Sequence, residues 1–416
     1  MSLWVDTEVG LCVGCVRDVV PAHRRRCASR PTGLDRGPRH QRADSGLRAP
    51  SASLGRQSLP TPSSAREPMS VSRPADDAGI RRLGELAFAA GNAAAIQTAT
   101  RLKIPDLIDD KPVPVEELAQ KTGLDPHLLY RLLRALTTYG VFEEVGERTF
   151  AHTEVSLPLR EDSPDGIRNL ILWIGAPWTW QAWPRLEEAL RTGKSVIPGV
   201  YGKEFYDYLR EDAPDDEQLF ARAMTDSSAR SSHVVAQTLD LSGVGRVVDI
   251  GGGQGLLLRS LLDRFPDLRG ALFDFEQVVA GAHEDLKDGG RLASRTGIVP
   301  GNCLESVPVE ADVYILKNLL DWPDESSRTV LRNITASAPR GARVIIIDSL
   351  VDAHPDEMRI TTTLDLFLLM NVGGQKHGLA GFDKLFAETG IETLSVQTVP
   401  GTLPLLHIVE GGLHRG

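Results

Sequence analysis

The sequence predicts an α/β protein, with a mostly parallel sheet of seven strands covered by helices on both faces and a smaller helical module before it. Short, fully apolar strand patterns alternate with helical patterns from residue 245 onward, which is typical of a parallel sheet buried on both sides. The last two strand patterns follow each other across a Pro-Gly turn, which predicts an antiparallel hairpin at one edge of the sheet.

The seven expected strands are read from runs rich in aliphatic and β-branched residues. In chain order they cover residues 247–250, 271–275, 295–299, 312–317, 342–348, 395–399 and 405–411. Pro400 and Gly401 separate the last two. Helical patterns fill the intervals between the first five, so those strands are expected to run parallel.

A glycine-rich turn follows the first of these strands and carries the strongest functional signal. Residues 249–255 read DIGGGQG, and the helical run LLLRSLLDRF comes next. Glycine lets the backbone approach a ligand closely, and the N–H groups that open a helix favour polar or negative groups. Asp274 ends the next strand, about one βαβ unit downstream, where a carboxylate can accept hydrogen bonds from ribose hydroxyls. The pattern lacks the Gly-Lys-Ser/Thr of a P-loop and the spacing of a dinucleotide fingerprint.

The helical module reads as helix, turn, helix and β wing. Residues 80–104 carry small apolar residues at helical spacing, and residues 114–140 predict two helices separated by a turn at Gly123. Asp125 caps the second helix, and a wing turns at Gly146. A winged helix can bind DNA, but the second helix carries only Arg131 and Arg134 as cations in an acidic chain, which argues against DNA contact.

Composition separates the N-terminal segment from the rest of the chain. The net charge is −10, but residues 1–74 hold twelve Arg, no Lys and six acidic residues, so they carry +6 and the remainder −16. The acidic part of the chain after residue 74 is poorly suited to binding the phosphate backbone of a nucleic acid. Residues 1–74 are expected to be disordered, and the change of composition after Met69 predicts that native translation starts there. Cys12, Cys15, Cys27 and His23 lie in this segment without the spacing of a known zinc motif.

The chain has no apolar run of the length of a signal peptide or membrane span, and its globular part contains only Cys303 as a cysteine. We therefore expect a soluble, cytoplasmic protein without disulfides or a metal site.

Aromatic residues gather in a helical region just before the sheet. Four of the six tryptophans fall between residues 173 and 183, and Phe205, Tyr206, Tyr208 and Phe220 follow them. Some of them must fill the core, but so many flat side chains also predict a slot for a planar substrate. We expect Trp173 and Trp178 to contribute to its walls.

Together these motifs resemble those of the S-adenosylmethionine-dependent class I O-methyltransferases of the plant and bacterial small-molecule type. DIGGGQG and Asp274 match the cofactor loop of that family, and Trp183 to Leu186, Leu190 to Gly193 and Phe205 to Tyr208 match further landmarks. The resemblance covers residue 80 to the C-terminus and includes members that tailor aromatic polyketides such as anthracyclines. It implies a Rossmann-like seven-stranded methyltransferase sheet and an all-helical winged-helix dimerisation domain. It also implies a homodimer, with S-adenosyl-L-methionine as cofactor and an aromatic natural product, such as an antibiotic polyketide, as substrate.

The resemblance also divides the chain and assigns site residues. The expected domains are a tail (1–74), the winged helix (75–165), a helical substrate-binding linker (166–235) and the cofactor-binding methyltransferase domain (236–416). The expected cofactor contacts are Ser228, Asp249, Gly251, Gly253, Asp274, Asn302, Cys303 and Lys317. An asparagine oxygen at Asn302 can accept from the adenine amino group. Met224 and Asn318 are expected to contact the substrate.

The proton acceptor of the family is missing. Most members have a histidine in the segment L-H-D-W, but this chain reads Leu319-Leu320-Asp321-Trp322, and the segment counted from Lys317 is one residue short. The two acidic positions beside that histidine correspond to Asp348 and to a segment in which Lys376 replaces the acid. His377 is then the candidate substitute base, with Asp348 as its partner.

Three interpretations remain open at this point. Methyl transfer can proceed by proximity alone if the hydroxyl is acidic enough. The scaffold can instead use its cofactor for hydroxylation or decarboxylation, or it can be a catalytically silent dimer.

Overall fold

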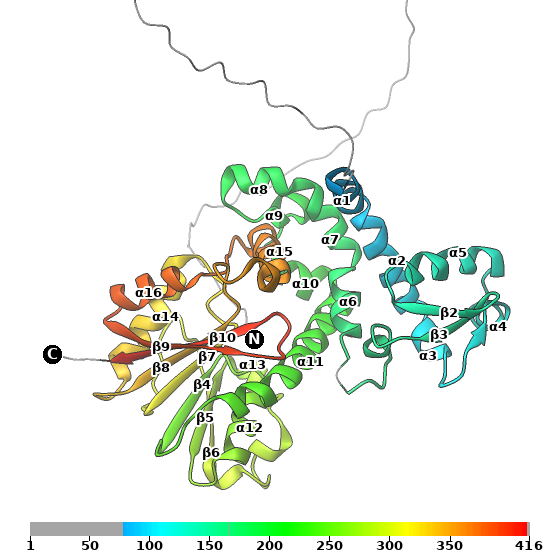
Figure 1. Ribbon diagram of the computed structural model, residues 1–416. Coiled ribbons are helices and arrows are strands. Elements are labelled where there is room, and N and C mark those ends of the chain that lie inside the picture. The colour runs from blue at the N-terminus through cyan, green and yellow to red at the C-terminus, as the bar shows by residue number, and fades with distance from the viewer. Residues whose placement is uncertain (1–77, 165, 414–416) are drawn as a thin grey trace, which may run out of the picture. The chain divides into compact units, whose positions relative to one another are not determined.

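A computed structural model describes residues 78–164 and 166–413 (Figure 1). The predicted N-terminal tail, with Met69, Cys12, Cys15, Cys27 and His23, lies outside the described residues. Within the described part of the chain, every helix is too short or too polar to cross a lipid bilayer.

The N-terminal module contains five helices and a three-stranded sheet in the order β1-β3-β2. Its elements are α1 (Ala78–Ala87), α2 (Ala89–Arg101), α3 (Ile104–Leu107), β1 (Val113–Pro114), α4 (Val115–Thr122), α5 (Pro126–Thr137), β2 (Phe142–Gly146) and β3 (Thr149–His152). The winged-helix pattern is therefore confirmed, but the module is not all-helical. The helical stretch expected over residues 80–104 is divided at Phe88 and again after Arg101.

Local chemistry explains the boundaries of the two wing-side helices. The Asp125 carboxylate accepts hydrogen bonds from the backbone N–H groups of His127 and Leu128, and Pro126 occupies the first helical position. Gly123 ends α4 with a φ of 71°, which a residue with a side chain rarely adopts. Both features agree with the sequence prediction.

The central helical region runs from residue 168 to residue 238. Its helices are α6 (Arg168–Ile174), α7 (Pro177–Ala182), α8 (Leu186–Thr192), α9 (Ile197–Tyr201), α10 (Phe205–Asp212) and the long α11 (Pro214–Thr238). These helices share an aromatic core with the later helix α15 (Pro355–Val372).

The C-terminal sheet has seven strands in the order β6-β5-β4-β7-β8-β10-β9. The strands are β4 (Arg246–Ile250), β5 (Arg269–Asp274), β6 (Thr296–Pro300), β7 (Val313–Lys317), β8 (Arg343–Asp348), β9 (Ile391–Val399) and β10 (Leu406–Leu413). The first five are parallel, and β10 pairs antiparallel with both β8 and β9. All seven predicted strands and the edge hairpin are thus confirmed.

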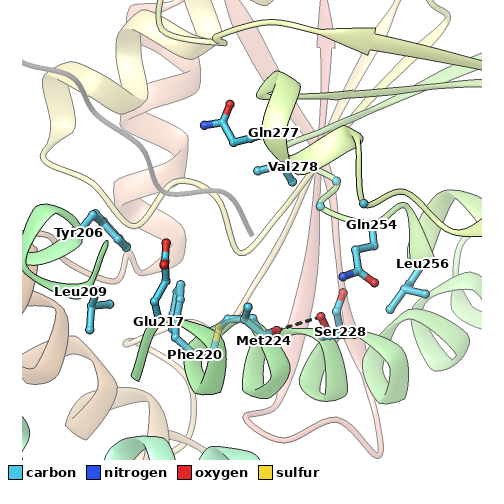
Figure 2. A pocket seen from close by; sticks show the side chains of 15 residues that line it. Tyr206, Leu209, Glu217, Phe220, Met224, Ser228, Gln254, Leu256, Gln277 and Val278 are labelled. Atoms are coloured by element: carbon cyan, nitrogen blue, oxygen red, sulfur yellow. Dashed lines mark hydrogen bonds between the residues drawn. The ribbon is translucent and has the colours of Figure 1, made fainter. Parts of the chain in front are cut away.

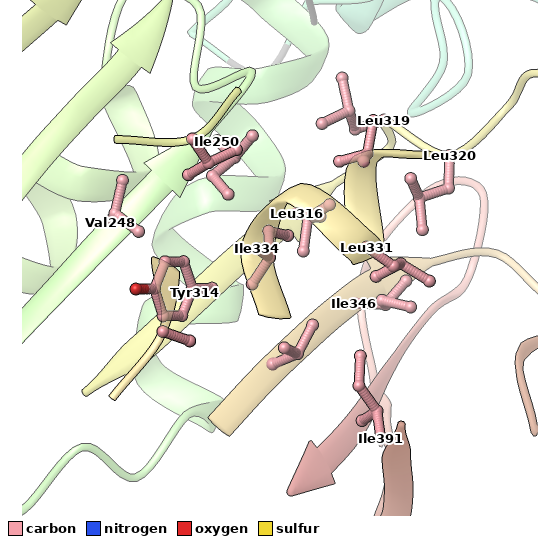
Figure 3. Close-up of a cluster of buried hydrophobic side chains, with 14 of the residues drawn as sticks. Val248, Ile250, Tyr314, Leu316, Leu319, Leu320, Leu331, Ile334, Ile346 and Ile391 are labelled. Atoms are coloured by element: carbon pink, nitrogen blue, oxygen red, sulfur yellow. The ribbon is translucent and has the colours of Figure 1, made fainter. Parts of the chain in front are cut away.

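Two apolar clusters cover the two faces of this sheet. One includes Val248, Tyr314 and Ile346 and packs against α14 (Asp324–Ser337) and α16 (Leu379–Glu388), as Figure 3 shows in part. The other includes Val247 and Ile315 and packs against α12 (Leu256–Arg264). Since the parallel strands all end at the same edge, the turns after β4, β5 and β7 meet there, next to the short helix α13 (Glu276–Val279).

Candidate active site

Three neighbouring cavities surround the glycine turn between β4 and α12. The largest of the three, about 270 Å³, lies between α10, α11 and α13 and reaches Gly252 and Gly253 (Figure 2). The second lies beside Asp274, and the third beside Asp249. All eight residues predicted to contact the cofactor line at least one of them, namely Ser228, Asp249, Gly251, Gly253, Asp274, Asn302, Cys303 and Lys317.

The glycine turn is packed too tightly for other residues. Gly251 has a φ of 65°, and a Cβ added to it would lie 2.6 Å from Leu319. A Cβ on Gly252 would lie 2.6 Å from Leu272 and 2.7 Å from the Asp249 carboxylate. The turn is also tied to the next strand, because the Gly253 N–H donates to Oδ2 of Asp274 over 2.9 Å. Asp274 therefore secures the turn as well as facing the second cavity.

The third cavity contains two buried groups of opposite charge. Asp249 is 2% exposed, and its Oδ2 atom has no hydrogen-bond partner among the described residues. Burial raises the pKa of Asp249 to about 6, although the nearby Lys317 ammonium opposes this shift. Burial likewise lowers the pKa of Lys317 to about 8. Nζ of Lys317 lies 3.4 Å from Oγ of Ser228 on α11.

This set of groups fits the amino-acid end of S-adenosylmethionine. A buried carboxylate oxygen without a protein partner can accept from an ammonium group, and a lysine and a hydroxyl can donate to a carboxylate. The second cavity supplies the aromatic side chains Phe273, Phe275 and Trp322, suited to an adenine ring. Its Asn302 is already engaged, since Oδ1 accepts from the Leu304 N–H over 3.0 Å.

The predicted substrate residues divide into two groups. Met224 lines the first and third cavities, and Asn318 lines the third. Trp173 and Trp178 do not line these cavities; they are 5% and 1% exposed and belong to the aromatic core. The prediction that they form the slot is therefore wrong, because their rings pack on Phe367 of α15 and on each other.

Two of the aromatic residues expected around the substrate slot, Tyr206 on α10 and Phe220 on α11, line the first cavity. Leu209 on α10 and Glu217 on α11 also line it, and the sequence interpretation did not assign these two. The signal that could have found Glu217 is its spacing from Phe220, Met224 and Ser228, which places all four along one side of a helix.

At the position of the family histidine the structure has an apolar core. Leu320 is 1% exposed and packs with Leu319 in the cluster that covers one face of the sheet (Figure 3). His377 is 6% exposed, contacts the ring of Phe382 and lines none of the three cavities. Burial lowers the pKa of His377, and its Nε2 has no hydrogen-bond partner among the described residues. It is thus not a solvated loop residue, the usual setting of an isolated loop histidine.

Lys376 occupies the centre of this region and joins two carboxylates. Its Nζ lies 2.7 Å from Oδ1 of Asp321 and 2.6 Å from Oδ1 of Asp348, and all three side chains are at most 3% exposed. Burial opposes the charge on Lys376, but the two carboxylates outweigh it and raise its pKa. Asp348, expected as the partner of His377, forms its side-chain ion pair with Lys376.

Comparisons with known proteins agree with this architecture. A family model for an O-methyltransferase dimerisation domain matches residues 85–159, and one for an O-methyltransferase domain matches residues 183–392. A mitomycin biosynthesis 6-O-methyltransferase from Streptomyces lavendulae is 37% identical over 73% of this chain and 86% of its own length. A phenazine O-methyltransferase from Lysobacter antibioticus is 34% identical over 76% and 91%.

Solved structures give the same result. The mitomycin 7-O-methyltransferase has a TM-score of 0.71 at 35% identity, covering 81% of this chain and 98% of its own. A methyltransferase of calicheamicin biosynthesis, solved with S-adenosylhomocysteine (SAH) bound, has a TM-score of 0.72 at 31% identity, covering 82% and 100%. With the cofactor cavities at the carboxyl edge of a seven-stranded sheet, these matches show that the chain belongs to the S-adenosylmethionine-dependent O-methyltransferase family.

Proposed function

We propose that this enzyme methylates a hydroxyl group of an aromatic natural product, and that it does so without a histidine base. The observation that carries the proposal is the continuity of the cavities: Met224, Ser228 and Gly252 line both the charged third cavity and the larger aromatic one. Relatives act on related molecules, among them a dihydroxy-methylnaphthoate and a demethylpuromycin. The dimerisation domain at residues 85–159 makes the protein a homodimer.

Some residues of the chain hold the cofactor, and others orient the acceptor. Asp249, Lys317 and Ser228 hold the amino-acid end of the cofactor, and the glycine turn faces its ribose with Asp274. When bound, S-adenosylmethionine supplies a methyl group on a sulfonium, a good leaving group. Met224 and Phe220 place the acceptor ring, so that the reaction depends on alignment.

The proton of the hydroxyl must leave without help from the usual pair of residues. Lys376 engages both Asp321 and Asp348, and Leu320 cannot accept a proton. A phenol in a conjugated, hydrogen-bonded ring system ionises more readily than an ordinary phenol, whose pKa is about 10. Proximity of such a phenol to the cofactor is then sufficient for methyl transfer. His377 contributes only through its packing in the core. Because S-adenosylmethionine is an intracellular metabolite, we also propose a cytoplasmic location.

The test is incubation with methyl-labelled S-adenosylmethionine and a panel of phenolic polyketides and naphthols. Transfer of label to oxygen supports the proposal. A product that gains oxygen or loses carboxylate without label would identify one of the alternative reactions. Calorimetry with S-adenosylhomocysteine separates all of these cofactor-dependent reactions from a catalytically silent dimer, which would release no heat when this ligand is added.

A further inference from the structure

Glu217 is the only ionisable acid or base, apart from Tyr206, among the described residues that line the 270 Å³ cavity beside the glycine turn. The other lining residues are apolar, hydroxyl-bearing, amide or glycine residues, and none is Lys, Arg or His. Figure 2 shows Glu217 rising from α11 beside Phe220, with Tyr206 and Leu209 on the same side of the cavity. The opposite wall presents the neutral Gln254 and Gln277.

The surroundings of Glu217 make its charge available to a ligand. Its side chain is partly buried, and the described residues provide it with no salt bridge or side-chain hydrogen bond. A carboxylate between aromatic and aliphatic side chains is less screened than one on an open surface. It attracts a cation or an N–H donor and repels an anionic ligand.

Its position along α11 sets the distance from the reacting end. Glu217 precedes Met224 by two helical turns, which corresponds to about 10 Å along the helix axis. Met224 and Ser228 border the cavity that contains Asp249 and Lys317. The carboxylate therefore lies at the end of the acceptor cavity remote from the cofactor, farther away than one aromatic ring extends.

We propose that the acceptor is an extended aromatic molecule with a basic amine at the end remote from the hydroxyl that is methylated, and that Glu217 binds this amine. This inference rests on the proposed function and adds the substrate class. It excludes acceptors with a carboxylate at that end, because the cavity places an anion against Glu217 and offers it no cation.

The experiment uses three hydroxynaphthalenes that carry an aminoethyl, a carboxyethyl or an ethyl group on the second ring. Calorimetry with the full chain saturated with S-adenosylhomocysteine gives the Kd of each without turnover. We expect the amine to bind about tenfold more tightly than the ethyl compound and the acid to bind more weakly than both. Glu217→Gln should remove the advantage of the amine, and Glu217→Lys should transfer it to the acid.

Glu310→Gln is the matched control, because Glu310 is exposed and precedes β7 at the opposite edge of the sheet. It should leave all three affinities unchanged. Equal affinity of the wild-type protein for the amine and the acid, or no binding of the amine, overturns the inference. If S-adenosylhomocysteine binds but the amine binds no more tightly than the acid, the inference about the acceptor fails while the proposed function stands. Failure to bind S-adenosylhomocysteine would instead overturn the proposed function.

Discussion

The ammonium nitrogen of Lys376 lies 2.6 Å from Oδ1 of Asp348, the residue that the family resemblance predicts as the partner of a catalytic histidine. The same nitrogen also contacts Asp321, so one buried cation serves two buried carboxylates. Burial raises the pKa of Asp321 to about 7, and the nearby Asp348 carboxylate adds to this rise, whereas Lys376 opposes it. Two positions where the resemblance predicts acid-base residues, Asp348 and Lys376, therefore belong here to a buried ionic network with Asp321.

Lys376→Met should destabilise the fold by about 3–5 kcal/mol, because it leaves two buried carboxylates without a cation. Urea unfolding at neutral pH measures this loss. Lys121→Met, which removes an exposed partner of Glu117, should leave the stability almost unchanged. Equal effects of the two substitutions would contradict a structural role for the network.

His377→Ala should retain most of the methyl-transfer rate, since the imidazole lines none of the three cavities and lies in the core beside Phe382. Steady-state kinetics with a labelled methyl group measures kcat, and thermal unfolding of the same variant reports the loss of packing. A fall of about two orders of magnitude or more in kcat, with the fold intact, would identify His377 as the base.

Cofactor affinity should weaken as the pH falls through about 6, the pKa to which burial raises Asp249. Below that pH the carboxylate takes up a proton and loses its attraction for the ammonium of the cofactor. Calorimetry with S-adenosylhomocysteine between pH 5 and pH 8 follows this change, and about a tenfold weakening per pH unit is the limit for a single proton.

Asp249→Asn is the companion variant. It should bind S-adenosylhomocysteine more weakly at neutral pH, and its affinity should not change with pH near pH 6. A profile unchanged from that of the wild-type protein would assign the pH dependence to another group.

Gly251→Ala should abolish cofactor binding, because the added methyl group meets Leu319 at 2.6 Å and the residue must keep a φ of 65°. Gly193→Ala is a control with the same φ of 65° but no atom within 4 Å of the added Cβ. It should cost about 1 kcal/mol of stability and leave cofactor affinity intact. Similar affinities for S-adenosylhomocysteine in the two variants would show that the turn tolerates a methyl group at residue 251, which contradicts the prediction.

Trp178→Leu should act mainly on stability, and Met224→Ala mainly on KM for the acceptor. Trp178 is 1% exposed and packs on Phe205 and Phe367. Its replacement by leucine leaves a cavity, which should lower the free energy of unfolding by about 3 kcal/mol or more. Met224 lines the acceptor cavity. Denaturant unfolding and acceptor titration separate the two effects. A raised KM with unchanged stability in Trp178→Leu would indicate that Trp178 contacts the acceptor, which contradicts the prediction.

The seven strands, the edge hairpin, the wing, the caps at Gly123 and Asp125 and the glycine turn at 249–255 were all readable from the sequence. Each depends on interactions within a few residues: a short run of apolar residues, a capping carboxylate, or a backbone conformation that only glycine adopts readily. Most of the residues expected to hold the cofactor line the cavities for a related reason, since they lie at or after the ends of strands that a parallel sheet brings to one edge. The missing histidine was visible as Leu320.

Only the tertiary structure shows which side chains take the place of the missing histidine and its partners. The sequence presents Asp321, Asp348 and Lys376 as three separate residues, and their ion pairs exist because β7, β8 and the segment after α15 meet at one point. Packing also placed Trp173 and Trp178 in the core and left Glu217 at the cavity wall, although all three lie on helices with mixed patterns. Hydrophobic periodicity identifies which residues face inward, but only the arrangement of the helices determines whether that interior is core or cavity.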